Sequence, residues 1–277
     1  MQSIQAAMPK KGRMALQSVD GDVPPDVFDR RLADLEALVP VWSANFAAPL
    51  LAAVARDLDA GLVPGAAHVL DVGTGAGYPA LELAARHPGL KVEAIDPWQA
   101  AVARARARGV AAFHGDLLTW EGGPYDAIVA NVCLNVIPDR AGAALALARL
   151  LRPGGRLYAT VALRGILREL DRAAARICGA RQVLEQVQEQ RLTVMTLREA
   201  FAGAAFSQLV VEVGHFPLCF ESGTAMAGSV PIRLGFADLY RQLLGEDGWQ
   251  RLIAVLDREH GIAFDVPFAL LTATRAS

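Results

Sequence analysis

The chain has little that would mark a disulfide-stabilised, metal-binding or redox protein. Its only cysteines, Cys133, Cys178 and Cys219, are far apart and odd in number. None of them has the close spacing of a metal site or a redox pair, and an odd count does not suit a disulfide framework. We therefore expect no metal site, and we expect all three thiols to be small buried apolar side chains.

Long apolar runs and a strong net charge are also missing. Residues 47–55 are largely apolar, but Arg56 ends that run far short of the length that crosses a bilayer. Lys10, Lys11 and Arg13 have no apolar segment behind them, so the N-terminus resembles neither a signal peptide nor an anchor. The net charge of −2 disfavours a dedicated nucleic-acid-binding protein, which usually presents a basic face. These absences predict a cytoplasmic protein that binds neither membranes nor nucleic acids.

What is present suits an α/β domain with an elaboration. The chain has 277 residues, of which 53% are apolar, and this is ample for a buried core. Almost all of its basic residues are arginine, and alanine and glycine are abundant, which is typical of a GC-rich bacterial genome. Residues 1–25 are polar and end in Gly-Asp-Val-Pro-Pro, so we expect a flexible tail. Helical spacing of apolar residues over 26–64, on both sides of Pro40, predicts N-terminal helices.

From residue 65 the pattern alternates between strand and helix. The expected strands are 68–72, 91–95, 110–113, 125–130 and 156–161, and the expected helices are 80–87, 99–108 and 141–151. A long helical stretch, 166–205, and two further strands, 208–213 and 264–274, follow. Short apolar strands separated by helices predict a parallel, doubly wound sheet, whose ligand lies at the carboxyl ends of the strands.

The last two strands are separated by an insertion, 222–261. Its apolar residues predict two helices divided by the turn 245–248. The predicted domain therefore spans 26–277. Its core is formed by 65–221 and 262–277, and the insertion is a lid over the substrate, part of the core, or a dimer contact.

A glycine-rich loop between the first strand and its helix carries most of the functional information. Gly73, Gly75 and Gly77 let the backbone approach a ligand closely and aim free N–H groups at it. Nicotinamide domains use such a loop too. Here, however, the third glycine comes one residue early, Tyr78 stands where the dinucleotide fingerprint has glycine, and Asp71 precedes the loop. These details disfavour a cofactor that contains pyrophosphate.

Several segments together resemble the class I, Rossmann-like S-adenosylmethionine-dependent methyltransferases. Residues 71–77, Asp-Val-Gly-Thr-Gly-Ala-Gly, match the first motif of that family, and Asp96 ends the second strand like its ribose-binding acid. Residues 115–117, 125–131 and 150–157 are similar to its later motifs. The resemblance covers about residues 35–275. It implies a mostly parallel seven-stranded sheet with a reversed seventh strand and helices on both faces.

The resemblance also implies contacts with S-adenosylmethionine. Asp96 would bind the ribose diol, Asp116 the adenine amine, and Asp71 with the Asn131 carbonyl the methionine ammonium, while Leu117 and Trp98 would flank the purine. Both Asp96 and Asp116 could instead be ordinary turn residues at strand ends, and Trp98 could be packing. The expected cofactor contacts are Asp71, Gly73, Thr74, Gly75, Gly77, Asp96, Pro97, Trp98, Asp116, Leu117 and Asn131.

The methyl acceptor is expected between the N-terminal helices, the segment after the fourth strand, and the insertion. His215 is the candidate catalytic base, although a lone histidine is more often structural. Asn135 would orient the acceptor or simply complete a turn. The expected acceptor contacts are Trp42, Asn45, Phe46, Tyr78, Asn135 and Phe220.

The class of acceptor follows from what the fourth-strand motif lacks. Residues after Ala130 read Asn-Val-Cys, without the Asn/Asp-Pro-Pro-Tyr/Phe run of enzymes that methylate amino groups of bases. We therefore expect transfer of a methyl group to an O, N or C atom of a small metabolite by a monomer or homodimer. Two alternatives stay open: a nicotinamide-dependent oxidoreductase, and a methyltransferase-like binding subunit without catalysis.

Overall fold

The computed structural model describes two compact units. The described residues are 33–179, 181–259 and 261–277, so the predicted tail 1–25 and the start of the segment 26–64 lie outside them. The larger unit contains the described residues up to Ala162 together with Leu192–Gly214 and Phe268–Ser277, and the smaller contains Leu163–Arg191 and His215–Pro267. The smaller unit thus includes the predicted insertion 222–261 and also residues assigned by the prediction to the core.

Five parallel strands alternate with helices in the larger unit, as the apolar pattern predicts. The strands are β1 (His68–Val72), β2 (Lys91–Asp96), β3 (Ala111–His114), β4 (Tyr125–Asn131) and β5 (Leu151–Ala162), and the intervening helices are α4 (Ala80–Arg86), α5 (Gln99–Ala107) and α6 (Arg140–Leu150). Strand β5 begins earlier than expected, at Leu151, because the Pro153-Gly154-Gly155 segment passes into it through an irregularity in the ladder.

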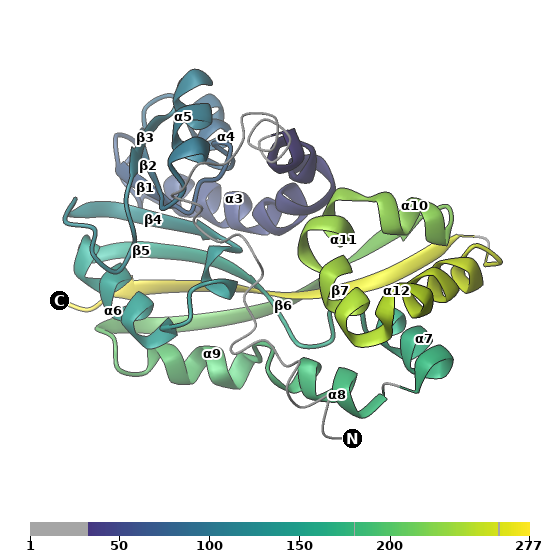
Figure 1. Cartoon of the computed structure of the whole chain (residues 1–277). Helices are drawn as coiled ribbons and strands as arrows, with labels where there is room; N and C mark the ends of the chain where they lie inside the picture. The colour runs from purple at the N-terminus through teal and green to yellow at the C-terminus, as the bar shows by residue number, and fades with distance from the viewer. Residues whose placement is uncertain (1–32, 180, 260) are drawn as a thin grey trace. The chain divides into compact units, whose positions relative to one another are not determined.

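The seven strands have the order β3-β2-β1-β4-β5-β7-β6 (Figure 1). The last two strands are β6 (Phe206–Phe220) and β7 (Ile262–Arg275), both longer than predicted, and β7 runs antiparallel to β5. The order of the parallel strands reverses between β1 and β4, which is where ligands bind in open sheets of this kind. The fold-class prediction is confirmed.

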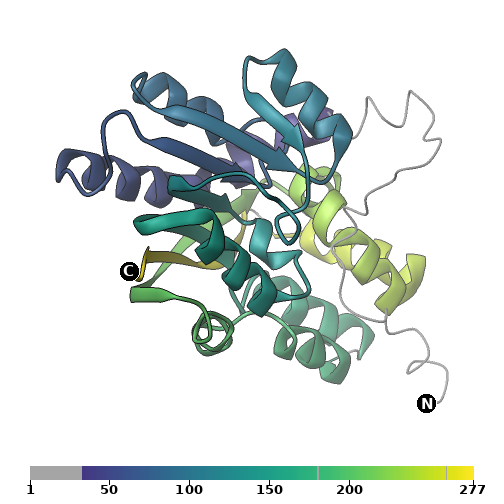
Figure 2. The same ribbon diagram turned by 90° about the vertical axis from the view of Figure 1, so that its left-hand side faces the viewer.

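Helices cover both faces of the sheet. Helices α3 (Ala44–Asp59), α4 and α5 lie on one face, and α6 lies on the other (Figures 1 and 2). Helix α9 (Val194–Phe201) packs beside α6. The faces of the strands are therefore covered, and the loops at their carboxyl ends are left to form a site.

The N-terminal helix is continuous from Ala33 to Asp59. Pro40 does not divide it, because a π-helical turn, η1 (Val39–Ser43), accommodates the missing backbone donor. By length and composition this helix resembles a membrane span, but such a match is weak evidence because core helices of soluble proteins pass the same test. Its apolar side chains Phe46, Leu50 and Val54 are fully buried within the larger unit.

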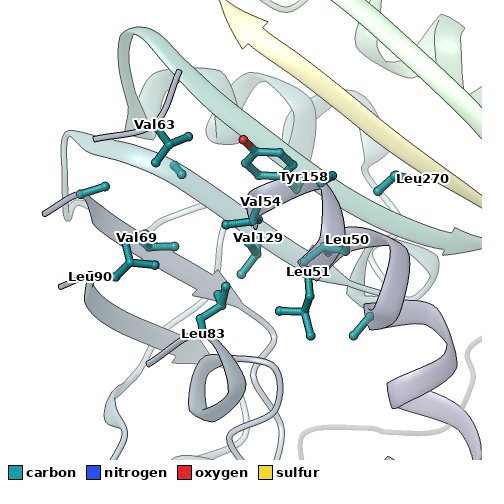
Figure 3. Packing of buried hydrophobic residues seen from close by; sticks show 14 residues of the cluster. Leu50, Leu51, Val54, Val63, Val69, Leu83, Leu90, Val129, Tyr158 and Leu270 are labelled. Carbon is teal, nitrogen blue, oxygen red and sulfur yellow. The ribbon is translucent and has the colours of Figure 1, made fainter. Parts of the chain in front are cut away.

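The core of the larger unit forms where α3 meets the sheet (Figure 3). Leu50 and Val54 of α3 pack with Val69 of β1, Val129 of β4 and Tyr158 of β5, all fully buried. Each such side chain contributes about 1.5–3 kcal/mol by leaving water. This cluster fixes α3 against the strands whose ends carry the candidate site.

The helical stretch expected over 166–205 is three helices: α7 (Arg168–Cys178), α8 (Arg181–Glu189) and α9. Helix α7 ends at Gly179, which takes a left-handed conformation with φ 65°, and α9 begins anew with a capping box between Thr193 and Thr196. Turn and cap residues therefore override the continuous helical pattern.

The insertion contains three helices instead of two: α10 (Gly223–Gly228), α11 (Val230–Gly235) and α12 (Ala237–Leu256). Helix α12 is interrupted at Gly245, with φ 71° and ψ 167°, at the start of the predicted turn. On its two sides the rings of Tyr240 and Trp249 stack with centroids 5.9 Å apart, and both side chains are fully buried. The aromatic stripe of the insertion is thus core of the smaller unit.

Candidate functional site

The glycine loop forms a tight turn at the carboxyl ends of β1 and β2. The backbone N–H groups of Gly73 and Thr74 donate to the Ile95 carbonyl at 2.8 and 3.2 Å. Gly73 has φ +71°, and a Cβ on it would lie 2.5 Å from the Cβ of Cys133. A Cβ on Gly75, by contrast, would meet no atom within 4 Å. Gly73 therefore permits close packing of two loops, and Gly75 borders open space.

Asp96, at the end of β2, ties this loop to the next one. Its Oδ2 accepts a hydrogen bond from the Gly75 N–H at 2.9 Å, and its Oδ1 accepts one from the Trp98 N–H at 2.8 Å. The residue is 9% exposed, and burial raises the pKa of its carboxyl. Each oxygen keeps a second lone pair. Asp96 can therefore hold the loop and still accept hydrogen bonds from a ligand diol.

Asp71, at the end of β1, is fully buried and only partly satisfied. Its Oδ2 accepts from the Ala80 N–H at 3.2 Å, while its Oδ1 makes no hydrogen bond of good geometry among the described residues. Burial raises the pKa of this carboxyl to about 7, and the nearby charge of Asp96 adds to the rise. The Thr74 side chain also interacts with this carboxyl and acts to lower its pKa. An orphaned carboxylate oxygen is costly, and a ligand ammonium would neutralise it.

The loops after β2 and β3 lie next to Asp96. The Gly115 N–H donates to the Asp96 carbonyl at 3.1 Å, and a ring nitrogen of His114 lies 3.0 Å from the Pro97 carbonyl oxygen. Trp98 is half-buried, and Pro97 is exposed. Strands β2 and β3 pair in parallel, so the loops that follow them lie side by side.

Asp116 and Leu117 occupy this second loop in different ways. Asp116 is exposed, and its Oδ1 accepts from the Leu118 N–H at 2.8 Å, which closes a local turn. Leu117 is 4% exposed. The turn-forming role that the sequence left open for Asp116 is therefore present, and this turn uses only its Oδ1.

The turn after β4 supports the glycine loop from its other side. Asn131 donates from Nδ2 to the Ser43 carbonyl at 3.0 Å, and its Oδ1 accepts from the Thr160 hydroxyl at 2.8 Å. Val132 has φ +63°, a strained conformation for a β-branched residue. This conformation directs Cys133 against Gly73. The Asn131 side chain therefore positions the turn, and only its backbone carbonyl remains as the expected ligand contact.

Sequence reasoning missed that the turn after β4 packs against the glycine loop, because no pattern in the sequence linked Cys133 to Gly73. Burial raises the pKa of the Cys133 thiol, with the charges of Asp71 and Asp96 adding to the rise. The expectation that all three cysteines are buried is wrong for Cys219, which is exposed on β6 while its neighbour Leu218 is buried, and Cys133 is only partly buried. The Cys178 side chain lies outside the described part of the chain.

The expected acceptor contacts of the larger unit differ in their exposure. Trp42 is 6% exposed and Phe46 fully buried, with ring centroids 5.2 Å apart, while Asn45 is exposed and donates to the Val41 carbonyl. Asn135 exchanges two 2.9 Å hydrogen bonds with the backbone of Ala162. Asn135 thus holds the end of β5, and Trp42, Asn45 and Phe46 lie in the N-terminal helix.

Tyr78, the remaining expected contact of this unit, lies directly after the glycine loop. It is half-buried and packs against the core cluster that includes Leu83. Burial raises the pKa of its phenol. Tyr78 directly follows Gly77, where an added Cβ would be crowded by the side chains of Val110 and Leu81.

His215 and Phe220 belong to the smaller unit. His215 lies within β6, and its Nδ1 is 2.8 Å from Oδ2 of Asp265 on β7. His215 and Asp265 line a shallow, mostly apolar depression together with Glu169, Phe216 and Phe264, whereas Phe220 does not line it. The sequence could not show the pairing of His215 with Asp265, because it joins residues 50 positions apart on neighbouring strands.

The donor set of the larger unit suits an adenosyl-sulfonium ligand better than a metal. In the part of the chain that the structure describes, no three His, Cys, Asp or Glu side chains could hold a metal ion together. The open space at Gly75, the orphaned Oδ1 of Asp71 and the spare lone pairs of Asp96 are instead complementary to an amino group and a diol.

Comparison with known proteins agrees with this chemistry. Residues 69–155 match a family described as a methyltransferase domain. The chain is 33% identical to trans-aconitate 2-methyltransferase of Mycobacterium tuberculosis over 118 residues, which cover 42% of this chain and 44% of that protein. It is 28% identical to malonyl-[acyl-carrier protein] O-methyltransferase of Laribacter hongkongensis over 69% of each chain. The match thus spans less than half the length of the trans-aconitate methyltransferases.

Solved structures share the fold. Phosphoethanolamine N-methyltransferase 2 of Haemonchus contortus, in complex with S-adenosyl-L-methionine, superposes with a TM-score of 0.56 at 17% identity, covering 91% of this chain and 60% of that one. The YcgJ protein of Bacillus subtilis gives 0.52 at 16% identity, covering 80% and 99%. At these identities the similarity establishes the fold alone.

Proposed function

We propose that this chain, which carries a class I S-adenosylmethionine-dependent methyltransferase domain, transfers a methyl group to an O, N or C atom of a small-molecule metabolite. The observation that carries the proposal is the meeting of two buried carboxylates with one glycine loop. Asp71 and Asp96 lie at the ends of adjacent strands. Asp96 accepts from the Gly75 N–H within the loop, and Asp71 accepts from the Ala80 N–H at the start of the helix that follows the loop. When bound, S-adenosylmethionine supplies a methyl group that its sulfonium has made electrophilic.

Each residue has a role that follows from its chemistry. Oδ1 of Asp71 accepts from the ligand ammonium, and the Asn131 carbonyl assists it. Asp96 accepts from the ribose diol while it anchors Gly75 and Trp98. Asp116 accepts from the adenine amine, Trp98 and Leu117 flank the purine, and the backbone of Gly73, Thr74, Gly75, Gly77 and Pro97 completes the contacts. Preorganised groups of this kind favour transfer mainly by positioning the reactants.

His215 is the proposed base for an acceptor that must lose a proton. Its Nδ1 faces Asp265, so its Nε2 is left to take the proton. A carboxylate acceptor needs no base, because it is already an anionic nucleophile. The proposed acceptor contacts remain Trp42, Asn45, Phe46, Tyr78, Asn135 and Phe220, with residues 222–261 as a lid.

The relatives suggest which acceptors to try first. Their names give trans-aconitate and a malonyl group as acceptors, and both molecules carry carboxylates. We propose that carboxylate-bearing metabolites are the acceptor class of this chain. We further propose a bacterial, cytoplasmic enzyme, as a monomer or homodimer, that acts on neither nucleic acid nor membrane.

Calorimetry with S-adenosylhomocysteine and with NAD tests the cofactor. We expect the first to bind and the second not to bind, and the reverse would favour a nicotinamide-dependent oxidoreductase. Release of S-adenosylhomocysteine from a panel of carboxylates, phenols and amines then tests turnover. Cofactor binding without turnover on any metabolite extract would point to a binding subunit.

A further inference from the structure

The turn after β4 is held in a strained conformation by contacts with β5 at both of its ends. Val132 has φ +63° and ψ −5°, in the left-handed region that a β-branched residue disfavours. At its start, the Val132 N–H donates to the Thr160 carbonyl at 2.9 Å. At its end, the Asn135 side chain exchanges two 2.9 Å hydrogen bonds with the backbone of Ala162. A strained residue persists only where its surroundings impose the strain, so these contacts keep the turn in place.

The Asn131 side chain fixes the start of this turn through two further partners. The Ser43 carbonyl can only accept, so it holds the amide with Nδ2 facing the N-terminal helix, at 3.0 Å. The amide oxygen then faces β5, where the Thr160 hydroxyl donates to it at 2.8 Å. Thr160 is fully buried, so solvent could not replace this donor. The Thr160 hydroxyl is therefore the group that completes the hydrogen bonding of Asn131.

This fixed turn lies beside the glycine loop, within the larger unit. Asp71 pairs with Val129, so Asn131, two residues further along β4, lies level with the loop. The charges of Asp71 and Asp96 both act on the Cys133 thiol, which places the turn close to the two carboxylates. A shift of the turn would therefore move the Asn131 carbonyl relative to Asp71, the two groups expected to hold the ligand ammonium.

We propose that Thr160 is a positioning residue for the methionine end of S-adenosylmethionine: by donating to the Asn131 side chain, its hydroxyl sets the backbone carbonyl that accepts from the ligand ammonium. This inference rests on the proposed function, and it adds to that function a residue that no sequence motif marks. Thr160 acts through Asn131 and needs no contact with the ligand. The adenosine end is assigned to Asp96 and Asp116, so loss of the hydroxyl should affect the ammonium end alone.

Two ligands that share the adenosine end separate positioning from a general structural role. S-adenosylhomocysteine carries the amino-acid portion, and 5′-methylthioadenosine lacks it. NMR titration of the full chain measures both affinities, weak binding included. Thr160→Val keeps the shape and removes the donor, so we expect affinity for S-adenosylhomocysteine to fall about five- to tenfold, and affinity for 5′-methylthioadenosine to stay within about twofold. Thr160→Ser keeps the hydroxyl and should retain most of the affinity for S-adenosylhomocysteine.

The matched control is Thr272→Val, the same change at another buried strand position, on β7. It should change neither affinity. A folded Thr160→Val protein that binds S-adenosylhomocysteine as the wild type does overturns the inference. Equal losses for the two ligands overturn it as well, because they are the mark of general structural damage. If this variant does not fold, Thr160→Cys takes its place: its thiol is a weak donor, so a smaller loss confined to S-adenosylhomocysteine is expected, and the same two outcomes overturn the inference.

The wild type separates this inference from the proposed function. A wild type that binds no S-adenosylhomocysteine would contradict the proposed function itself. A wild type that binds it, together with Thr160 variants that show no selective loss, would contradict only the role of Thr160.

Discussion

Replacement of Asp96 tests two roles of one carboxylate separately: its hydrogen bonds to the loop backbone and its proposed contact with the ligand. Both of its oxygens accept backbone N–H groups inside a buried turn. A hydrogen bond to a charged group contributes roughly 1.5–3 kcal/mol. Asp96→Ala deletes both bonds and leaves the Gly75 and Trp98 donors unpaired, so we expect a loss of about 3–6 kcal/mol in the free energy of unfolding.

The isosteric change gives a sharper result. Asp96→Asn keeps one acceptor oxygen, so one of the two backbone bonds survives and the stability loss should be about half as large. Its amide nitrogen cannot accept from a diol, and it presents N–H donors to a ribose hydroxyl instead. We expect affinity for S-adenosylhomocysteine to fall by about 10–100-fold, which corresponds to roughly 1.4–2.8 kcal/mol.

Urea denaturation and calorimetry measure the two effects independently. Asp238→Asn, an exposed acid in the smaller unit, serves as the control and should change neither quantity. The reasoning is refuted if Asp96→Asn is stable and binds S-adenosylhomocysteine as tightly as the wild type. It is equally refuted if Asp96→Ala unfolds at the same urea concentration as the wild type.

Three further predictions concern the larger unit. Because burial raises the pKa of Asp71 to about 7, the native state holds a proton that the unfolded state has lost between about pH 4 and 7. The stability of the unliganded chain should therefore fall as pH rises through this window, and Asp71→Asn should flatten a plot of melting temperature against pH while weakening S-adenosylhomocysteine binding. Asp57 is 2% exposed and pairs with Arg156, so Asp57→Asn should cost about 3 kcal/mol in urea denaturation and leave ligand affinity unchanged. Gly73→Ala should cost about 1–3 kcal/mol and weaken binding, because its Cβ would lie 2.5 Å from that of Cys133, and Cys133→Gly should restore part of both losses.

Each of these predictions has a contrary outcome. A melting temperature that keeps the same pH dependence in Asp71→Asn would mean that another group titrates. Lost ligand affinity in stable Asp57→Asn protein would connect the end of α3 to the site. A Gly73→Ala protein with native stability would mean that the two loops separate without cost.

The sequence alone determined the strand and helix alternation and the place of the glycine loop. Strands β1, β2 and β4 are short apolar runs whose ends are set by polar or glycine residues, so local pattern was sufficient. The local pattern was insufficient where turn and cap residues interrupt a run of helical spacing. The pattern predicted a long helical stretch over 166–205, but Gly179 and the Thr193 cap divide it.

Tertiary structure decided which side chains are available for chemistry. Local sequence marks Asp71 as an acid before a glycine loop, but only its burial leaves Oδ1 without a hydrogen bond of good geometry. Asp265 reaches His215 from a position 50 residues away, because β6 and β7 are neighbours in the sheet. Periodicity is a property of neighbours along the chain, whereas solvation and hydrogen-bond partners depend on residues that folding brings together from distant positions.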